Sequence, residues 1–235
     1  MSVLDSTTLR IPAPRPPRRG VFVSFEGGDG AGKSTQMAML REHLIHERQV
    51  SEDLVLTTRE PGGTPLGEQI RSLLLHGEHV DERAEALLYA ADRAHHIATV
   101  VRPHLARGGL VLGDRYLDSS IAYQGAGRDL RAAEVARLSA WATGELVPDL
   151  TVLLDVTPET GRARRHDRAE DRMETEAAEF HARVRAGFLG LAQAEPSRYL
   201  VLDAAEPPEA LAEAVATRVA RLLDDATNGE GGDRG

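Results

Sequence analysis

One segment near the start of the sequence, Gly27–Ser34, has the residue types that can surround a phosphate group. It fits the spacing G-x-x-x-x-G-K-[ST] at every fixed position and lies between a short apolar run and an amphipathic stretch. Glycines let successive backbone N–H groups turn inward around phosphate oxygens, and the start of a helix adds partial positive charge. The predicted nucleotide contacts are Gly27, Gly28, Asp29, Gly30, Ala31, Gly32, Lys33 and Ser34. The alternative, a glycine-rich turn without a ligand, rarely has this spacing and context.

Two side chains in this segment predict Mg-ATP as the ligand and Mg²⁺ as the only cofactor. Lys33 would bridge the β- and γ-phosphates, and the hydroxyl of Ser34 would coordinate the ion, whose other ligands are phosphate oxygens, water and a carboxylate. The chain has 28 lysine and arginine residues, and Lys33 is its only lysine, which fits a need for a compact point charge. We assign Asp29 to positioning of substrate or metal and not to proton abstraction. A turn-forming aspartate is its alternative.

The elements that must hold this segment follow an alternating pattern along the chain. Short apolar runs alternate with longer amphipathic stretches, which is typical of βαβ units around a parallel sheet. We therefore expect an α/β fold with a five-stranded parallel sheet flanked by helices. The predicted strands are Gly20–Glu26, Leu54–Thr58, Leu110–Asp114, Leu150–Val156 and Tyr199–Asp203. The predicted helices are Gly32–Glu47, Leu66–Leu75, Glu82–Ala106, Ala132–Thr143, Pro158–Arg165, Glu176–Ala194 and Pro208–Asp224.

Polar segments follow the ends of four of these strands. Ligands of open parallel sheets gather beyond the carboxyl ends of the strands. Gly27–Ser34, Arg59–Thr64, Asp114–Gln124 and Arg162–Glu174 follow the first four predicted strands in order. These segments are therefore expected to surround one site.

Length and composition narrow the class of protein further. The chain of 235 residues is expected to form one domain over residues 20–224, between a disordered basic tail rich in proline and arginine (1–19) and a flexible tail (225–235). A docking arm for an anionic partner is the alternative for the first tail. The formal net charge of -9 argues against a nucleic-acid coat, and the absence of cysteine excludes disulfides and thiolate zinc sites. Because no apolar run could span a membrane, we expect neither nucleic-acid nor membrane partners.

Four further motifs carry a resemblance to a known protein family. They are Thr58–Thr64 (TREPGGT), Leu87–Arg93 (LLYAADR), Asp114–Tyr116 (DRY) and Ser119–Gly125 (SSIAYQG). Together with the phosphate loop, they resemble thymidylate kinases in order and approximate spacing, from about Gly20 to Leu223. The resemblance implies a P-loop NTPase fold and a nucleoside monophosphate kinase that transfers the γ-phosphoryl group of ATP to dTMP, giving dTDP and ADP.

The resemblance also assigns residues to the acceptor. Tyr89 and Arg93 lie four residues apart on a predicted helix and therefore share a face. By resemblance Tyr89 stacks on thymine and Arg93 donates to a carbonyl at the base edge, although a core aromatic and a solvated charge are the alternatives from the residues alone. Arg59 and Arg115 would hold the monophosphate, and Asp114 would meet Mg²⁺. The predicted substrate contacts are Arg59, Tyr89, Arg93, Arg115, Ser120, Tyr123 and Gln124.

Two of these contacts have finer expectations, and one further arginine is a weaker candidate. Tyr123 resembles a residue that crowds the place of a ribose 2′-hydroxyl, which predicts a preference for deoxyribose. Gln124 is expected to reach the nucleotide. For Arg71, a contact with the acceptor and an ordinary charge on the helix surface are equally good interpretations.

A cluster of arginines after the fourth strand is expected to supply charge to the transferring group. The interior of the phosphate loop has no arginine, unlike that of some family members. Arg162, Arg164, Arg165, Arg168 and Arg172 resemble the lid of bacterial-type enzymes. We expect a mobile lid over about residues 162–174, with Arg168 and Arg172 beside the charge that develops during transfer. Solvated surface is the alternative. The predicted catalytic residues are Lys33, Asp29, Arg115, Arg168 and Arg172.

Some alternatives stay open from the sequence alone. A kinase of another nucleoside monophosphate shares most of these motifs, and a non-catalytic nucleotide-dependent regulator shares the phosphate loop. The regulator would need a blocked acceptor pocket. The resemblance further implies a cytoplasmic protein and a homodimer joined through helices near Glu82–Ala106 and Ala132–Thr143. His95 and His96 are expected to be packing or surface residues and not metal ligands.

Overall fold

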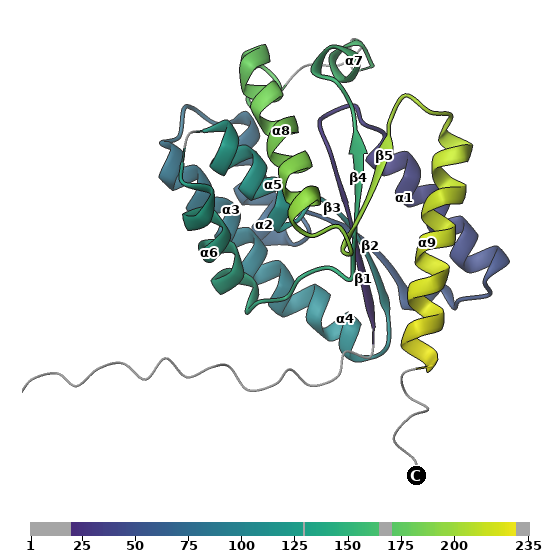
Figure 1. Cartoon of the computed structure of the whole chain (residues 1–235). Helices are drawn as coiled ribbons and strands as arrows, with labels where there is room; N and C mark the ends of the chain where they lie inside the picture. Colours follow the sequence, from purple (N-terminus) through teal and green to yellow (C-terminus); the bar gives the residue numbers. More distant parts are fainter. Residues whose placement is uncertain (1–19, 129, 165–170, 229–235) are drawn as a thin grey trace, which may run out of the picture.

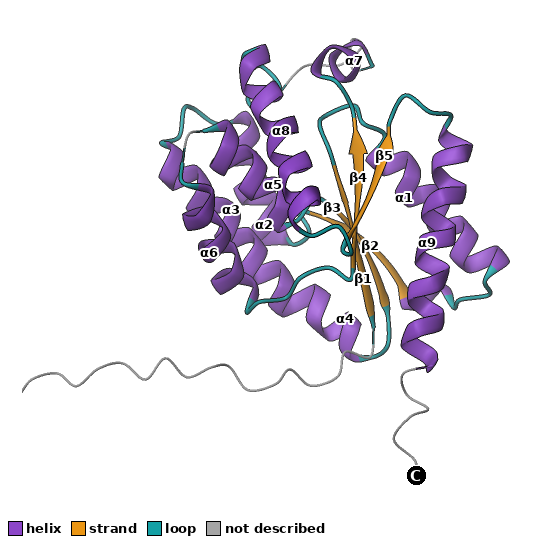
Figure 2. Cartoon of the chain, viewed as in Figure 1, coloured by secondary structure: helices purple, strands orange, loops and turns teal. Residues whose placement is uncertain are grey.

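The computed structural model describes residues 20–128, 130–164 and 171–228, which form one parallel sheet between two layers of helices (Figures 1 and 2). All four strand pairings are parallel, and the strand order is β2-β3-β1-β4-β5. The strands are β1 (Val21–Glu26), β2 (Val55–Arg59), β3 (Leu110–Asp114), β4 (Leu150–Asp155) and β5 (Tyr199–Asp203). The predicted five-stranded α/β fold is confirmed.

The helices cover both faces of this sheet. Figure 1 shows α1 and α9 on one side, and α3, α4, α5, α6 and α8 on the other. The α-helices are α1 (Lys33–Glu42), α2 (Pro65–His76), α3 (Glu82–His96), α4 (Arg102–Ala106), α5 (Leu117–Ser120), α6 (Ala132–Thr143), α7 (Pro158–Ala163), α8 (Ala178–Ala194) and α9 (Pro208–Asn228). Three π-helical segments, η1 (His43–Glu47), η3 (Ile97–Val101) and η4 (Ile121–Gly127), extend α1, α3 and α5, and a short 3-10 turn, η2 (Glu52–Leu54), precedes β2.

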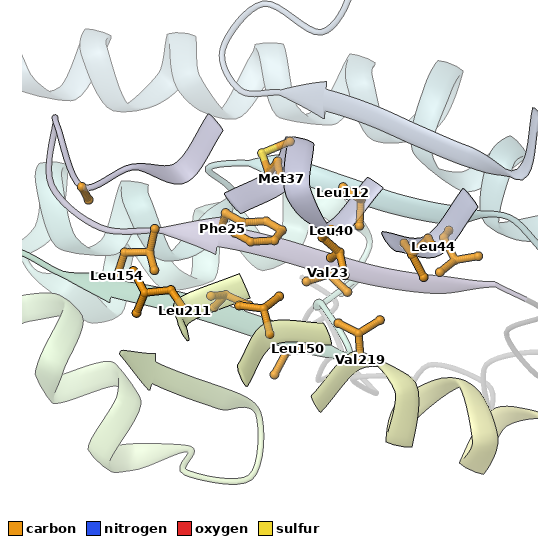
Figure 3. Packing of buried hydrophobic residues seen from close by; sticks show 14 of the residues in the cluster. Val23, Phe25, Met37, Leu40, Leu44, Leu112, Leu150, Leu154, Leu211 and Val219 are labelled. Atoms are coloured by element: carbon orange, nitrogen blue, oxygen red, sulfur yellow. The ribbon is translucent and has the colours of Figure 1, made fainter. Parts of the chain in front are cut away.

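The central strand β1, which leads into the phosphate loop, is buried on both faces. All six of its residues are buried, as expected for a parallel strand covered on both faces. On one face Val23 and Phe25 pack with Leu40 of α1 and Val219 of α9 (Figure 3). Phe22 packs on the opposite face against Tyr116, with ring centroids 4.9 Å apart. The loop that follows β1 therefore starts from the best-buried strand of the sheet.

The boundaries differ from prediction in several places. The predicted helix Glu82–Ala106 consists of α3, η3 and α4, and the last helix runs to Asn228 into the predicted C-terminal tail. The segment after β3, expected as a connection, contains α5 and η4. Residues 1–19, 165–170 and 229–235, which include Arg165, Arg168 and most of the two predicted tails, lie outside the described residues. Within the described ranges, no helix combines the length and apolar composition needed to cross a membrane.

Candidate active site

The phosphate loop lines a cleft of about 860 Å³ at the carboxyl ends of the strands. Gly30, Gly32, Lys33 and Ser34 line it, together with Asp114 at the end of β3. Gly32 has a φ of 96° and is the N-cap of α1, so the chain enters the helix in a conformation that favours glycine. The loop therefore presents the first turn of α1 to this cleft, which we call the donor cleft.

Lys33 is held against the loop that it belongs to. Its side chain is buried, and Nζ donates to the carbonyl oxygens of Gly27 at 3.2 Å and Gly28 at 3.1 Å. Burial lowers the pKa of Lys33, and the nearby Arg115 adds to this effect. The ammonium group is thus close to the place where the loop would surround phosphate oxygens.

The residues expected to hold Mg²⁺ fit a hard cation. Ser34 is exposed, and Asp114 Oδ1 is buried without a hydrogen-bond partner among the described residues. The two side chains line the same cleft. The described part of the chain contains no group of three or more His, Cys, Asp or Glu side chains that could hold a metal ion. A bound ion would therefore take most of its ligands from nucleotide phosphates and water, which suits Mg²⁺.

The start of the predicted lid packs directly on the phosphate loop. A Cβ on Gly30 would lie 2.4 Å from the carbonyl oxygen of Gly161 in α7, and a Cβ on Gly161 would lie 2.4 Å from that of Asp29. Only glycine fits at both positions. Arg164 extends from the end of α7 and donates to the carbonyl oxygen of Gly30 at 3.4 Å and to that of Ala204 at 2.8 Å. This arginine therefore lies on the donor cleft, whereas Arg168 lies outside the described residues.

A second, smaller cavity of about 80 Å³ lies beside the donor cleft, and we call it the acceptor cavity. Most of the predicted substrate contacts line it: Tyr89, Arg93, Arg115, Ser120, Tyr123 and Gln124. They come from α3, from the turn after β3, and from α5 and η4. The structure thus brings together six residues that the sequence spreads over three motifs.

Arg93 is fixed at the floor of the acceptor cavity. It is 2 % exposed and donates to Glu60 Oε2 at 2.7 Å, to the hydroxyl groups of Ser120 and Ser139, and to the carbonyl oxygen of Tyr116. Burial alone would lower the pKa of Arg93, but the charge of Glu60 outweighs it and raises the pKa. The alternative that Arg93 is a solvated charge on a helix surface is therefore wrong, since its guanidinium is buried and held by hydrogen bonds.

Arg115 and Asp29 lie where the two cavities meet. Both residues line the donor cleft and the acceptor cavity. Arg115 Nη2 donates to Asp29 Oδ1 at 2.6 Å and to the Tyr123 hydroxyl at 3.2 Å, and Nη1 donates to the carbonyl oxygen of Gly27 at 3.1 Å. Arg115 has a φ of 67°, which is uncommon for a residue with a side chain and is often found at functional sites.

Glu26 supports the turn that carries Arg115, although no motif in the sequence marks this residue. This last residue of β1 is fully buried and accepts from the backbone N–H of Tyr116 at 2.7 Å and from the Ser119 hydroxyl at 2.6 Å. The Ser119 hydroxyl in turn accepts from Arg115 Nη1 at 3.1 Å. Burial, with a further contribution from the charge of Asp118, raises the pKa of Glu26 to about 7.

The other two predicted acceptor arginines lie at different places. Arg59 is half exposed, pairs with Glu68 at 2.6 Å and lines the donor cleft. Arg71 donates to the carbonyl oxygen of Pro61 at 3.0 Å and lines both cavities. Arg71, the weaker candidate, therefore lines the acceptor cavity, whereas Arg59 does not.

Arg172, the second predicted lid arginine, is bound to the acceptor side. It donates to Glu85 of α3 and to the carbonyl oxygen of Leu74 at 2.8 Å. Its neighbours Asp171 and Met173 line the acceptor cavity. The carboxyl end of the predicted lid is thus attached to α2 and α3. Glu85 and Glu60 were not selected from the sequence, because nothing in the local spacing marks them as partners of Arg172 and Arg93.

The adjacent histidines have separate roles. His95 is exposed, while His96 is buried, with Nδ1 2.8 Å from Glu60 Oε1 and Nε2 2.7 Å from the Thr58 hydroxyl. His96 therefore packs under the segment after β2, as expected for a packing residue.

Known proteins with similar sequences and folds share one description. The sequence model of the family described as thymidylate kinase matches residues 25–215. A thymidylate kinase of Clavibacter michiganensis subsp. michiganensis is 58% identical over 208 residues, which cover 87% of this chain and 96% of that protein. One from Leifsonia xyli subsp. xyli is 55% identical over 90% of this chain and 98% of that protein. A crystal structure of thymidylate kinase from Ehrlichia chaffeensis is 30% identical, with a TM-score of 0.72, and covers 86% of this chain and 98% of that chain.

Proposed function

The chain belongs to the thymidylate kinase family and is a phosphotransferase, and we propose that it converts dTMP and Mg-ATP into dTDP and ADP. The observation that carries this proposal is the meeting of the donor cleft and the acceptor cavity at Arg115 and Asp29. A monophosphate in one cavity and a triphosphate in the other would direct their phosphates toward each other. The intact acceptor cavity argues against a non-catalytic regulator.

The reaction needs alignment and charge compensation more than proton transfer. A phosphate oxygen of the acceptor attacks the γ-phosphorus of ATP, the bond from that phosphorus to the bridging β-γ oxygen breaks, and ADP leaves. Since the acceptor oxygen is already anionic, no strong general base is required. Arg115, held by Asp29 and Ser119, is placed to orient the acceptor phosphate with a planar fork.

On the donor side, backbone N–H groups of the phosphate loop bind the phosphates. Lys33 exchanges its contacts with the loop carbonyls for the β- and γ-phosphate oxygens. Ser34 and Asp114 would hold Mg²⁺, which would supply positive charge beside the phosphates. Closure of the lid arginines over this cleft would exclude water and add positive charge.

In the acceptor cavity, the base stacks on Tyr89 and meets Arg93. Tyr89 lines the cavity and lies one helical turn before Arg93 on α3. Ser120 holds the guanidinium of Arg93 at 3.0 Å. Tyr123, whose hydroxyl contacts Arg115, occupies the side of the cavity nearest the phosphate and crowds a ribose 2′-hydroxyl. The cavity therefore favours a deoxyribonucleotide with a pyrimidine base.

The substrate is tested by measuring ADP production from Mg-ATP with each nucleoside monophosphate offered separately, ribo-TMP included. We expect dTMP to be the preferred acceptor and ribo-TMP a poor one. Lys33→Ala should lower turnover by about a thousandfold, since the group that meets the transferring phosphoryl is lost. A preference for another monophosphate would favour a kinase of different specificity, and no turnover despite ATP binding would favour a regulator.

We also propose a cytoplasmic homodimer. Four large apolar side chains are exposed on α2, α3 and α6: Leu66 43%, Leu73 55%, Leu87 57% and Trp141 81%. Helix α3 packs against both α2 and α6, and we propose that the three helices present a common surface to a second copy. Trp141→Asp should convert a dimer into monomers in light scattering, and an unchanged mass would exclude this surface. The cytoplasm is proposed because it holds the donor ATP.

A further inference from the structure

Glu85 is a buried carboxylate on the helix that carries the base contacts. It is 0% exposed and lies in α3 one helical turn before Tyr89 and two before Arg93. Residues at this spacing share one helix face, and Tyr89 and Arg93 both line the acceptor cavity. Glu85 is therefore on the face that turns toward the acceptor, one layer behind it.

Three side chains from two other segments converge on this carboxylate. Gln124 Nε2 donates to Oε1 at 2.9 Å, Arg128 donates to both oxygens at 3.3 Å, and Arg172 donates to Oε2. Burial alone would raise the pKa of Glu85, but the hydrogen bonds from these three partners outweigh it and hold the pKa below its usual value. Glu85 is thus a carboxylate that only accepts hydrogen bonds.

This contact fixes the orientation of the Gln124 amide. Because a carboxylate can only accept, the NH₂ end of the amide must face Glu85. The carbonyl oxygen is then the end that Gln124 keeps for a ligand. Gln124 is 1% exposed and lines the acceptor cavity. An amide held in this way offers an acceptor, whereas a free amide could turn and offer a donor.

Arg93 supplies the complementary donor to the same cavity. A guanidinium has five N–H donors, and Arg93 makes four hydrogen bonds with described residues. A base with a carbonyl oxygen beside a ring N–H, as in thymine or uracil at O4 and N3, matches a donor next to an acceptor. Cytosine has an amino group and an unprotonated nitrogen at these positions and would oppose both contacts.

We propose that Glu85 is a positioning residue for base specificity, which holds the Gln124 amide so that its carbonyl oxygen accepts from the ring N–H of the acceptor base. The proposal rests on the proposed function, since it assigns Gln124 a contact with the base of the monophosphate. Glu85 also holds Arg172, and through it the cavity-lining residues Asp171 and Met173. The carboxylate therefore fixes both the polar contact and one wall of the cavity.

The test compares dTMP, dUMP and dCMP as acceptors for the wild-type protein and Glu85→Gln. The substitution keeps the size of the side chain but permits the Gln124 amide to turn. We expect the ratio of kcat/KM for dTMP to that for dCMP to fall by at least about tenfold. The KM for ATP should stay within about twofold, because Glu85 does not line the donor cleft. Glu82→Gln, an exposed position on the same helix, is the matched control and should leave both values unchanged.

A purely structural role predicts a different result. If Glu85→Gln lowers kcat/KM for dTMP and dCMP by the same factor, or changes neither, Glu85 does not set base specificity. The double variant Glu85→Gln with Gln124→Glu restores an acceptor-only group beside an amide and should recover at least part of the lost ratio. Absence of recovery would overturn the proposal even if the single variant folds poorly. A wild-type protein without dTMP activity would instead overturn the proposed function, and the inference with it.

Discussion

The acceptor cavity and the donor cleft differ in how their charged side chains are held. In the acceptor cavity Arg93 is 2% exposed and makes four hydrogen bonds with described residues. Beside the donor cleft, Arg59 is 51% exposed in a surface pair with Glu68, and Arg164 is also exposed. One region is thus organised by buried side-chain pairs, and the other by the backbone of a loop with arginines at its edge.

From this difference we infer that the acceptor side determines selectivity between acceptors, and that the donor side determines the rate of transfer. Guanidinium groups that are desolvated and aligned on folding need little reorganisation when a substrate binds. Such groups can discriminate between acceptors by the partners that they require. We propose that exposed arginines near the donor cleft keep their hydration until the predicted lid closes, so that their charge acts late and on the transferring group. We therefore expect substitutions on the two sides to change different kinetic constants.

The largest effect on use of the acceptor is expected at Arg115, where the two regions meet. Arg115→Lys removes the planar fork that contacts Gly27, Ser119, Asp29 and Tyr123, and a single ammonium cannot replace these contacts. We expect kcat/KM for the acceptor to fall by about a hundredfold to a thousandfold in steady-state assays. The KM for ATP should change little. A loss of only a few fold would mean that Arg115 does not orient the acceptor phosphate.

Smaller effects are expected from the arginines at the two ends of the predicted lid. These effects test whether the acceptor cavity and the donor cleft act separately. Arg164→Ala removes contacts with Gly30 and Ala204 beside the donor cleft, whereas Arg172→Ala removes the contact with Glu85 on the acceptor side. We expect Arg164→Ala to raise the KM for ATP by about fivefold to tenfold, and Arg172→Ala to raise that for dTMP by a similar factor. Both constants come from saturation curves with the other substrate in excess.

Arg168, which lies outside the described residues, extends this pair to the part of the predicted lid that we propose to be catalytic. Arg168→Ala is expected to lower kcat by at least about a hundredfold, since an arginine at the transferring group can contribute a factor of roughly 10³ to 10⁵. If no alanine variant at Arg162, Arg164, Arg168 or Arg172 loses more than about tenfold in turnover, the lid supplies no catalytic charge. Equal changes in both KM values for Arg164→Ala and Arg172→Ala would remove the distinction between the two regions.

The order of elements was largely predictable from the sequence, but the segment after β3 was not. Apolar runs and amphipathic stretches alternate strongly enough to predict all five strands and most helices. Residues 117–127, in contrast, include Ser119, Ser120 and Gly125, which are weak helix formers. They form α5 and η4 because η4 packs closely against α8. Tertiary packing overrides local propensity at this segment, and no local pattern in the sequence reports it.

The site was predictable where its residues lie in motifs and unpredictable where a motif residue needs a distant partner. Arg93 and Arg115 could be selected from their motifs. Glu60 and Glu85 could not be assigned as the partners of Arg93 and Arg172, since the pairs Arg93–Glu60 and Arg172–Glu85 join separate elements. A single sequence has no spacing rule for such contacts. Acidic residues inside a motif, as Glu60 is, or within two residues before one, as Glu85 is, are the signal to look for.

The smallest effect concerns the stability of the acceptor side, and it follows from the pKa of Glu26. The pKa is raised from 4.5 to about 7 by burial and by the charge of Asp118, while Arg115 opposes this shift. A carboxyl group with a raised pKa in the folded state stabilises the fold fully below about pH 4.5, and the contribution is lost as the pH rises through 7. Glu26→Gln does not titrate, so its free energy of unfolding relative to that of the wild type should increase between pH 5 and pH 8.

Urea unfolding of both proteins at pH 5 and pH 8 measures this difference directly. We expect the relative free energy of unfolding of Glu26→Gln to rise by about 1 to 3 kcal/mol over this interval, whatever the constant cost of the changed hydrogen bonds to Ser119 and Tyr116. Glu82→Gln, at an exposed position, should show no such dependence. A flat difference for Glu26→Gln would mean that its carboxyl group titrates alike in the folded and unfolded states. Glu26 would then add no pH-dependent cost to the turn that carries Arg115, and the contrast between a pre-organised acceptor side and an open donor side would rest on Arg93 and Glu85 alone.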